Sequence, residues 1–346
     1  MISEEVLKKL PKIDLHCHLS GSIRPETILE ISVKEGISVP TDIIQDFKKY
    51  VQVDSDCKSL KEYLIKFDYN LMVMQKSEYL ERITYELVED AAANNVKYIE
   101  IRFAPMLHRD KGLTIEDTVE AVIRGMRKGE KKFDIKANLL LICMRHHSLE
   151  NSIEVIEKAS NYIGKGVVGV DLAGNEHDFE PVIHEEAFKL AKEKGLHRTV
   201  HAGETGIPQN IVVSVEKLFA ERIGHGVHAY QDEKVLGYIK EHKIPLEQCL
   251  TSNVQTKAVE SYESHPIKTY LDQGIVVTIN TDNMTVSNTN LNKEYKLLMD
   301  HQNFTLQDLK KALINSIKVA FLDEDEKSKL KLKMVKDIDS IIKNQR

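Results

Sequence analysis

Residues 11–22 read PKIDLHCHLSGS and place two histidines one residue apart, in a stretch with the pattern of a first β-strand. Alternate residues of a strand point to the same face, so His16 and His18 would project side by side. Two charged imidazoles on one face repel each other, whereas a shared metal ion would be bound by both. The pair therefore indicates a metal site at a strand end, with a chance pair of histidines as the alternative.

Seven further runs of apolar and β-branched residues follow, and segments with helical spacing separate most of them. This alternation predicts an α/β fold, a parallel sheet closed into a (β/α)8 TIM barrel. An open, doubly wound sheet is the structural alternative. The expected strands are residues 12–16, 96–103, 137–144, 167–172, 198–201, 222–225, 244–249 and 275–280, and the expected helices include 78–95, 115–133, 149–163, 182–195, 231–241 and 264–273.

Two regions depart from this alternation. Residues from about 25 to 75 are a helical insertion after the first strand, and residues from about 305 to 346 are extra C-terminal helices. The insertion carries an apolar stripe, a pattern that usually belongs to the core; its members are Leu60, Tyr63, Leu64, Phe67 and Leu71. Since no linker or internal repeat divides the sequence, we expect residues 1–346 to form a single domain.

The composition excludes several classes of protein. The chain has 346 residues and a formal net charge of −6, which argues against a nucleic-acid-binding surface. It contains no run of roughly eighteen apolar residues that could span a membrane, and its first residues lack the apolar core of a secretion signal. The four cysteines are scattered, so we expect reduced thiols and a cytoplasmic location.

Polar residues gather where the predicted strands end. Besides the two histidines, they are DLAGNE at 171–176, HAGE at 201–204, GHG at 224–226 and TDN at 281–283. Barrel enzymes build their active sites from the carboxyl ends of several strands. In a barrel these five stretches therefore converge, which no single motif could indicate.

Four of these residues form a candidate set of metal ligands: His16, His18, His201 and Asp282. Three imidazole nitrogens and one carboxylate oxygen suit zinc better than a metal that prefers thiolates. Asp282 follows the apolar run VVTIN, where a charge is costly without a cation. The set predicts one Zn²⁺ per chain, with ordinary structural side chains as the alternative.

Two further residues lie beside this set. Glu204 is a carboxylate three residues beyond His201, and Gly203 between them leaves room for a ligand to approach the backbone. His225 stands between two glycines at a strand end, where it could reach a water bound to the metal. Alone, residues of these two kinds are more often on the surface or structural.

Six motifs together resemble the adenosine deaminase family of the amidohydrolase superfamily. They follow one another as PKIDLHCHLSGSIRPETIL, DLAGNE, HAGE, RIGHG, TSN and VTINTDN, between about residue 8 and about residue 320. The resemblance implies a zinc-containing barrel that hydrolyses adenosine, and usually 2′-deoxyadenosine, to inosine and ammonia. It implies attack of zinc-bound hydroxide on purine C6.

The resemblance also implies roles for individual residues. The metal ligands match His16, His18, His201 and Asp282. Glu204 matches the acid that protonates purine N1. His225 matches the residue that positions the attacking water, and whether it also takes the proton of that water is open.

For the substrate, the resemblance implies contacts from His18, Ser20, Gly174 and Asn283, with the Gly174 N–H meeting purine N3. It implies that the apolar stripe partly lines the base pocket, through Leu60, Tyr63, Leu64 and Phe67 in a helix that caps the site. Many members have an acid where Ser20 stands and a second aspartate where Asn283 stands. Both departures concern substrate preference and leave the catalytic set intact.

Three alternatives to this interpretation differ in what they require. A deaminase of free adenine, or of another 6-aminopurine nucleoside, is the nearest, and DLAGNE favours the nucleoside enzyme. A purine-binding or signalling relative without turnover would need a broken ligand set or a secretion signal. A general metal-dependent amide hydrolase would be expected to have a lysine-bridged pair of metals.

Overall fold

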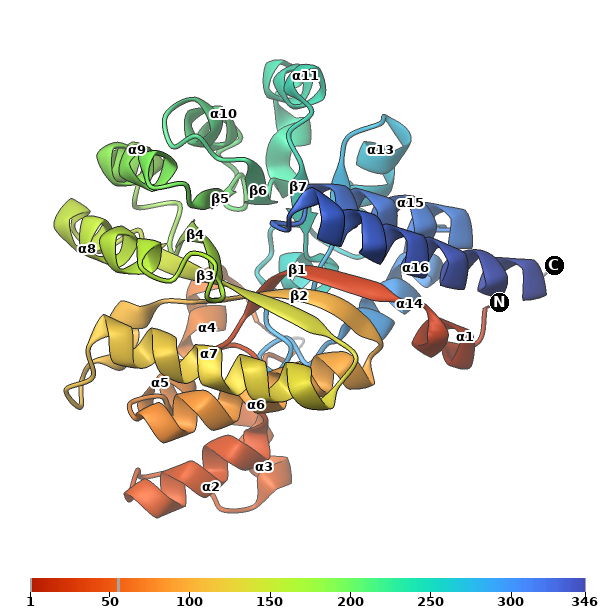
Figure 1. The fold of residues 1–346 in the computed structure, drawn as a ribbon. Coiled ribbons are helices and arrows are strands. Elements are labelled where there is room, and N and C mark those ends of the chain that lie inside the picture. Colours follow the sequence, from red (N-terminus) through yellow and green to blue (C-terminus); the bar gives the residue numbers. More distant parts are fainter. Residues whose placement is uncertain (1, 55–56, 346) are drawn as a thin grey trace.

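The computed structural model describes residues 2–54 and 57–345, and its centre is a sheet of eight parallel strands that pair in chain order. The strands are β1 (Lys12–His18), β2 (Val96–Phe103), β3 (Lys136–Met144), β4 (Val167–Ala173), β5 (His197–Ala202), β6 (Arg222–His225), β7 (Leu246–Gln248) and β8 (Val277–Ile279). The end of the sheet returns to its beginning, because Cys17 in β1 forms a parallel bridge with Asp282 after β8. The predicted barrel is confirmed, and Figure 1 shows helices arranged around it.

Helices lie between the strands along the chain and after the last strand. They are α6 (Ser77–Ala93), α7 (Ile115–Lys132), α8 (Leu149–Ser160), α9 (Glu185–Glu193), α10 (Gln209–Glu216), α11 (Glu233–His242), α12 (Leu250–Gln255), α13 (Ile267–Asp272) and α14 (Leu291–His301), with α1 (Glu4–Lys9) before β1 and short 3₁₀ turns η1 (Pro105–His108), η2 (Pro181–His184) and η3 (Val227–Gln231). Helix α10 was not among the expected helices, because its sequence QNIVVSVE is rich in β-branched residues. Packing against β5 and α11 decides its conformation.

Two strand boundaries differ from the expected ones, at the end of β1 and at the start of β7. Strand β1 continues to His18, two residues further than expected, so both histidines belong to the strand. Strand β7 begins only at Leu246, because Pro245 before it has no N–H to donate to a neighbouring strand. The Pro245 carbonyl still accepts a hydrogen bond from the N–H of Ile223 at 2.9 Å.

The insertion after β1 is helical, as predicted, and consists of α2 (Pro25–Glu35), α3 (Ile44–Val51), α4 (Leu60–Ile65) and α5 (Asp68–Val73). The apolar stripe spans two short helices and not one. The N–H groups of Lys66 and Phe67 bond three residues back, to the carbonyls of Tyr63 and Leu64, which is the tighter turn that ends α4. In Figure 1, α2, α3 and α5 lie together on one side of the barrel.

The extra C-terminal helices are α15 (Leu306–Val319) and α16 (Glu324–Asn344). Helix α15 packs against β1 and β8, so it covers the seam where the barrel closes, and α16 packs on α15. Within the described residues, no helix is long and apolar enough to cross a membrane. That all 346 residues form one domain stays a prediction.

Candidate active site

A pocket of about 330 Å³ opens at the carboxyl ends of the strands. The predicted site residues that line it are His18, Ser20, Leu60, Tyr63, Leu64, Phe67, Gly174, His201, Glu204, His225, Asp282 and Asn283. His16 lies behind them and is fully buried. The structure therefore brings together all the site residues expected from the sequence.

The ligand atoms of the four candidate metal ligands converge on one point. Nε2 of His18 lies 3.2 Å from Nε2 of His16 and 3.2 Å from Nε2 of His201. Oδ1 of Asp282 lies 3.3 Å from Nε2 of His18 and 3.5 Å from Nε2 of His16. A tetrahedral zinc site with bonds of about 2.0–2.1 Å separates its ligand atoms by about 3.3–3.4 Å. The four side chains thus fit one zinc ion.

Two other groups also bring ligand atoms within 4.8 Å of one another: His16, His201 and His225, and His16, Cys249 and Asp282. Nδ1 of His225 already contacts a side-chain amide, and its Nε2 lies 3.6 Å from Oε2 of Glu204. Burial raises the pKa of the Cys249 thiol well above its ordinary value, and the charge of Asp282 adds to this shift. Because a thiol must ionise to bind zinc well, the set of three histidines and Asp282 suits the ion better.

Buried carboxylates orient two of the ligand imidazoles. Nδ1 of His16 lies 2.9 Å from Oε2 of Glu247, and Nδ1 of His201 lies 3.1 Å from Oδ1 of Asp171. An Nδ1–H that donates to a carboxylate leaves the lone pair on Nε2, where a metal ion binds. Both imidazoles therefore present an acceptor nitrogen to the centre of the site.

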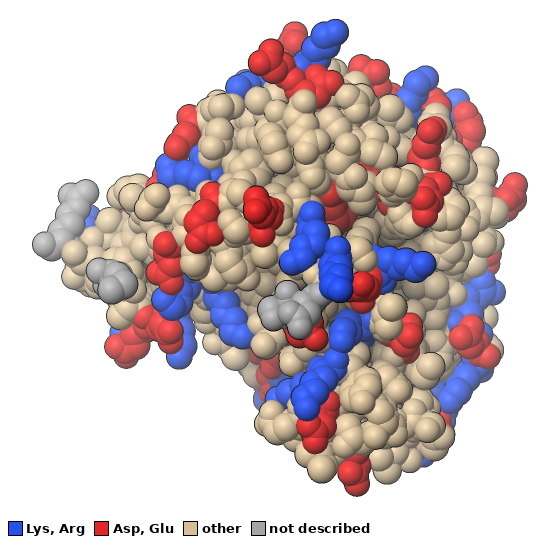
Figure 2. Space-filling view, turned by 180° about the vertical axis from the view of Figure 1, so that it is seen from behind, with Lys and Arg blue, Asp and Glu red and all other residues tan. Residues whose placement is uncertain are grey.

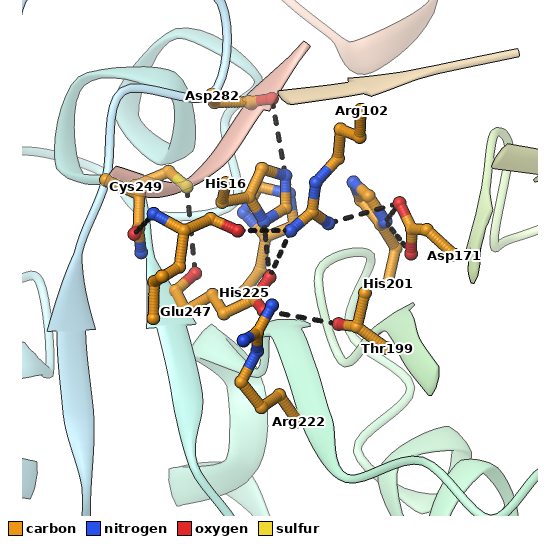
Figure 3. Close-up of polar contacts among 12 residues, drawn as sticks. His16, Arg102, Asp171, Thr199, His201, Arg222, His225, Glu247, Cys249 and Asp282 are labelled. Carbon is orange, nitrogen blue, oxygen red and sulfur yellow. Dashed lines mark hydrogen bonds and ion pairs between the residues drawn. The ribbon is translucent and has the colours of Figure 1, made fainter. Parts of the chain in front are cut away.

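Two buried arginines join these carboxylates into a network (Figure 3). Arg102 donates to Asp171 at 3.1 Å and to Glu247 at 2.9 Å, and Arg222 donates to Glu247 at 2.6 Å and also contacts Glu100. Burial alone would raise the pKa of the Asp171 carboxyl, but His201 and Arg102 outweigh it and hold that pKa below its ordinary value. The carboxylates therefore stay ionised and able to accept from the imidazoles.

Backbone hydrogen bonds across the seam of the barrel place Asp282 beside β1. The N–H of Asp282 donates to the His16 carbonyl at 2.8 Å, and the N–H of His18 donates to the Asp282 carbonyl at 2.7 Å. Asp282 and His225 both have left-handed backbones, with φ of 60° and 63°. This conformation is uncommon for residues other than glycine and typical of functional sites.

Glu204 lies in the same pocket and is buried to 8% exposure. Burial raises the pKa of its carboxyl to about 8, and the negative charges of Asp282 and Glu176 add to the shift. A carboxyl with this pKa keeps its proton at neutral pH and can donate it. Glu204 is thus suited to act as a general acid.

The loop that carries Glu204 is held by a residue to which sequence reasoning gave no role. The carboxylate of Glu176 accepts from the N–H groups of Gly203, Glu204 and Thr205 at 2.7, 2.9 and 3.0 Å, and from Asn210 Nδ2 at 3.0 Å. Glu176 is 2% exposed. It is the last residue of DLAGNE. This motif was visible in the sequence, but its hydrogen bonds to the loop after β5 were not.

Three more of the predicted positions line the pocket, Gly174, Ser20 and Asn283, and two polar residues to which the sequence gave no role, His146 and Thr256, line it as well. Gly174 has φ of 111°, a backbone conformation that favours glycine. A Cβ on Gly21 would lie 1.8 Å from Oδ1 of Asn283, so the amide oxygen packs where any larger residue would have its side chain. The amide N–H₂ of Asn283 is consequently directed away from Gly21.

Apolar side chains of α4 and α5 cover the pocket, and we call these two helices the cap. Tyr63 is 2% exposed and its hydroxyl lies 2.7 Å from Oγ of Ser287, whereas Leu64 at the edge is 42% exposed. Asn70 of α5 donates to the carbonyl of Ser20 at 2.6 Å. The cap is thus attached to the loop after β1 and forms an apolar roof over the pocket. We call the polar side chains at the strand ends beneath it, with the buried carboxylates and arginines behind them, the floor.

Comparisons with known proteins agree with this geometry. The adenosine deaminase family model matches residues 11–337. An adenosine deaminase of Clostridium kluyveri is 52% identical over 326 residues, which cover 94% of each chain. The solved structure of an adenine deaminase from Arthrobacter aurescens has a TM-score of 0.88 at 25% identity, covering 96% of this chain and 99% of the other. An amidohydrolase from Burkholderia ambifaria with bound Zn has a TM-score of 0.89 at 25% identity, covering 99% and 95%.

The fold, the polar cluster at the strand ends and these neighbours define an amidohydrolase-type TIM barrel. Within that class the long match to the family model and the 52% identity decide the family. The chain belongs to the adenosine deaminase family, and it is accordingly a deaminase of the hydrolase class.

Proposed function

We propose that this chain hydrolyses adenosine and 2′-deoxyadenosine to inosine and ammonia. The observation that carries the proposal is the position of Glu204, a buried carboxyl with a raised pKa, beside the converging ligand atoms of three histidines and Asp282. The name of the Clostridium kluyveri relative, at 52% identity, supports adenosine over free adenine as the substrate.

The proposed cofactor is one zinc ion per chain, held by His16, His18, His201 and Asp282. The spacing of their ligand atoms and the carboxylates behind two of the imidazoles support this assignment. A zinc ion in such a site supplies Lewis acidity, which lowers the pKa of a bound water to about 7.

The residues of the chain then have separate tasks at the purine. The Glu204 carboxyl donates its proton to N1, which makes C6 a better electrophile. His225 orients the attacking water, the Gly174 N–H meets N3, and the Asn283 amide N–H₂ donates to N7, which is an acceptor only. Ser20 contacts the ribose.

The cap excludes bulk water while the reaction proceeds, through Leu60, Tyr63, Leu64 and Phe67. In a water-excluded site, each hydrogen bond and charge acts more strongly on the reacting centre. The apolar roof and the polar floor therefore act together in this proposal.

A cytoplasmic location, a role in purine salvage and small nucleosides as partners complete the proposal. The four cysteines are buried free thiols, which suits a reducing compartment. Acidic side chains stand among the basic ones on the face that Figure 2 shows, so the described part of this face is not the uniformly basic surface that nucleic acid requires.

The test is a substrate panel on the purified protein, with zinc measured on the same sample. We expect about one zinc per chain and faster ammonia release from adenosine and 2′-deoxyadenosine than from adenine. Turnover of adenine without turnover of adenosine would assign the chain to the adenine enzymes. Full activity in a verified metal-free sample would contradict the proposed cofactor.

A further inference from the structure

His225 begins a hydrogen-bonded chain of three buried side chains, which continues through Asn253 and His265 on the side away from the pocket. Nδ2 of Asn253, in α12, lies 3.1 Å from Nδ1 of His225, and Oδ1 of Asn253 lies 3.1 Å from Nε2 of His265. Nδ1 of His265 in turn lies 3.2 Å from the backbone N of Ile267. The three side chains are between 0% and 3% exposed, so these contacts are shielded from water.

The direction of each hydrogen bond follows from the outer end of the chain. The backbone N–H of Ile267 can only donate, so Nδ1 of His265 must accept. Burial lowers the pKa of His265 to about 3, which makes its ring neutral with a single proton. That proton is on Nε2, and it is donated to Oδ1 of Asn253.

Asn253 transmits this direction to His225. Because its amide oxygen accepts from His265, its N–H₂ group faces His225 and donates to Nδ1. A proton on Nδ1 of His225 would point at the amide protons of Asn253. Nε2 of His225, which faces the pocket 3.6 Å from Oε2 of Glu204, therefore carries the ring proton.

The neighbouring histidines have the opposite arrangement. Nδ1 of His16 and Nδ1 of His201 each meet a carboxylate, which can only accept, so their Nε2 atoms present lone pairs. The group behind each ring thus decides whether the ring offers an acceptor or a donor to the same pocket.

We propose that Asn253 and His265 are positioning residues that hold His225 in its Nε2–H form, so that His225 donates a hydrogen bond to the attacking oxygen and is not the base that removes its proton. The identity of that oxygen rests on the proposed function. The tautomer rests on the hydrogen-bond chain and can be tested without any turnover.

The decisive measurement is nitrogen-15 NMR of the zinc-loaded protein labelled in its histidine rings, with the His225 signals identified by their loss in a His225→Gln variant. Long-range proton–nitrogen spectra distinguish a protonated ring nitrogen from an unprotonated one. We expect a protonated Nε2 and an unprotonated Nδ1 in His225. A proton on Nδ1 would overturn the inference whether or not the protein deaminates adenosine.

The Asn253→Asp variant tests the consequence for catalysis. A carboxylate accepts from both neighbours, so the His225 proton should move to Nδ1 and kcat should fall by about 10–100-fold with KM changed less than about threefold. Unchanged kcat in a variant whose proton has moved would overturn the donor role. If the variant does not fold, the spectrum of the parent protein still decides the tautomer.

Variants at His265 provide the matched control. Gln can donate to Asn253 and accept from Ile267, so His265→Gln should keep the Nε2–H form of His225 and restore kcat to within about threefold of the parent. His265→Leu removes the donor, and we expect a mixture of His225 tautomers with a lower kcat. Equal tautomer populations in the two variants would show that His265 does not orient Asn253.

Discussion

The floor of the pocket and its cap hold their side chains by different means. On the floor, Glu247 and Asp171 orient two of the candidate ligand imidazoles, His16 and His201, and Arg102 binds both carboxylates in turn. The cap is held mostly by apolar contacts, with hydrogen bonds from Tyr63 and Asn70 to the loops below.

This difference has consequences for substitution. Removing the partner of a buried charge lowers the stability of the fold. It also changes the orientation of the imidazole that this charge holds. Shortening an apolar side chain at the edge of the cap lowers the stability of the fold only a little, because part of its surface is already exposed. Substitutions in the floor should therefore affect metal binding and chemistry, and substitutions in the cap should affect substrate binding.

The largest effect is expected from removing a floor ligand. His201→Ala should lose the zinc ion and with it all measurable deamination, since three ligands no longer close the site. Zinc content by mass spectrometry and ammonia release are measured on one sample. His177→Ala is the control, because His177 is an exposed histidine that does not line the pocket; it should keep both zinc and activity. An active, zinc-free His201→Ala protein would contradict the ligand set.

The next effect concerns Glu204, the proposed acid on the floor. Glu204→Gln keeps the shape of the side chain and removes its proton, so kcat should fall by about 10²–10⁴-fold while substrate still binds. The parent needs this carboxyl protonated, so its kcat/KM should fall as the pH rises through a pKa of about 8. The variant should lack this loss at high pH. Activity within a few-fold of the parent would show that another group is the acid.

Smaller effects are expected from the carboxylates behind the ligands. Asp171→Asn weakens the acceptor for His201, and we expect zinc affinity to fall by about 10–100-fold in a chelator competition. Glu100→Gln is the matched control, because Glu100 is also buried but its hydrogen bonds are with Arg222, Tyr98 and Phe321 and not with a candidate ligand imidazole. It should lower the melting temperature and leave zinc affinity unchanged. An equal loss of affinity in both would mean that the network acts as a whole.

The floor also shows what the sequence could predict. The strands were predictable from β-branched apolar runs, and the convergence of the four candidate ligands was predictable because a barrel brings strand ends together. Glu100 and Arg102 were not recognised, although they stand two residues apart in β2 and share a face. A charged residue in a strand has the pattern of a solvent-facing position. Its partner Glu247 is 145 residues away from Arg102, and only the closed barrel shows that both are inside.

The cap was predictable in composition but not in form. Leu60, Tyr63, Leu64 and Phe67 follow helical spacing, and both core packing and pocket lining agree with such a stripe. The break between α4 and α5 has no glycine or proline to mark it. Likewise, Asn253 and His265 could not be linked to His225, because hydrogen bonds between side chains far apart in the sequence leave no periodic pattern.

The smallest effect is expected at the edge of the cap. Leu64 lines the pocket and is 42% exposed, so Leu64→Ala removes apolar surface that a bound nucleoside would cover. At about 25 cal/mol per Å², the loss of about 40 Å² of such contact corresponds to about 1 kcal/mol, or about a fivefold rise in KM. The zinc content, kcat and melting temperature should stay close to those of the parent, because no floor residue depends on Leu64. The neighbouring Ile65 is 57% exposed and does not line the pocket, so Ile65→Ala should leave KM unchanged. A loss of kcat of more than about tenfold in Leu64→Ala would mean that the cap takes part in the chemical step, and the division between floor and cap would then fail.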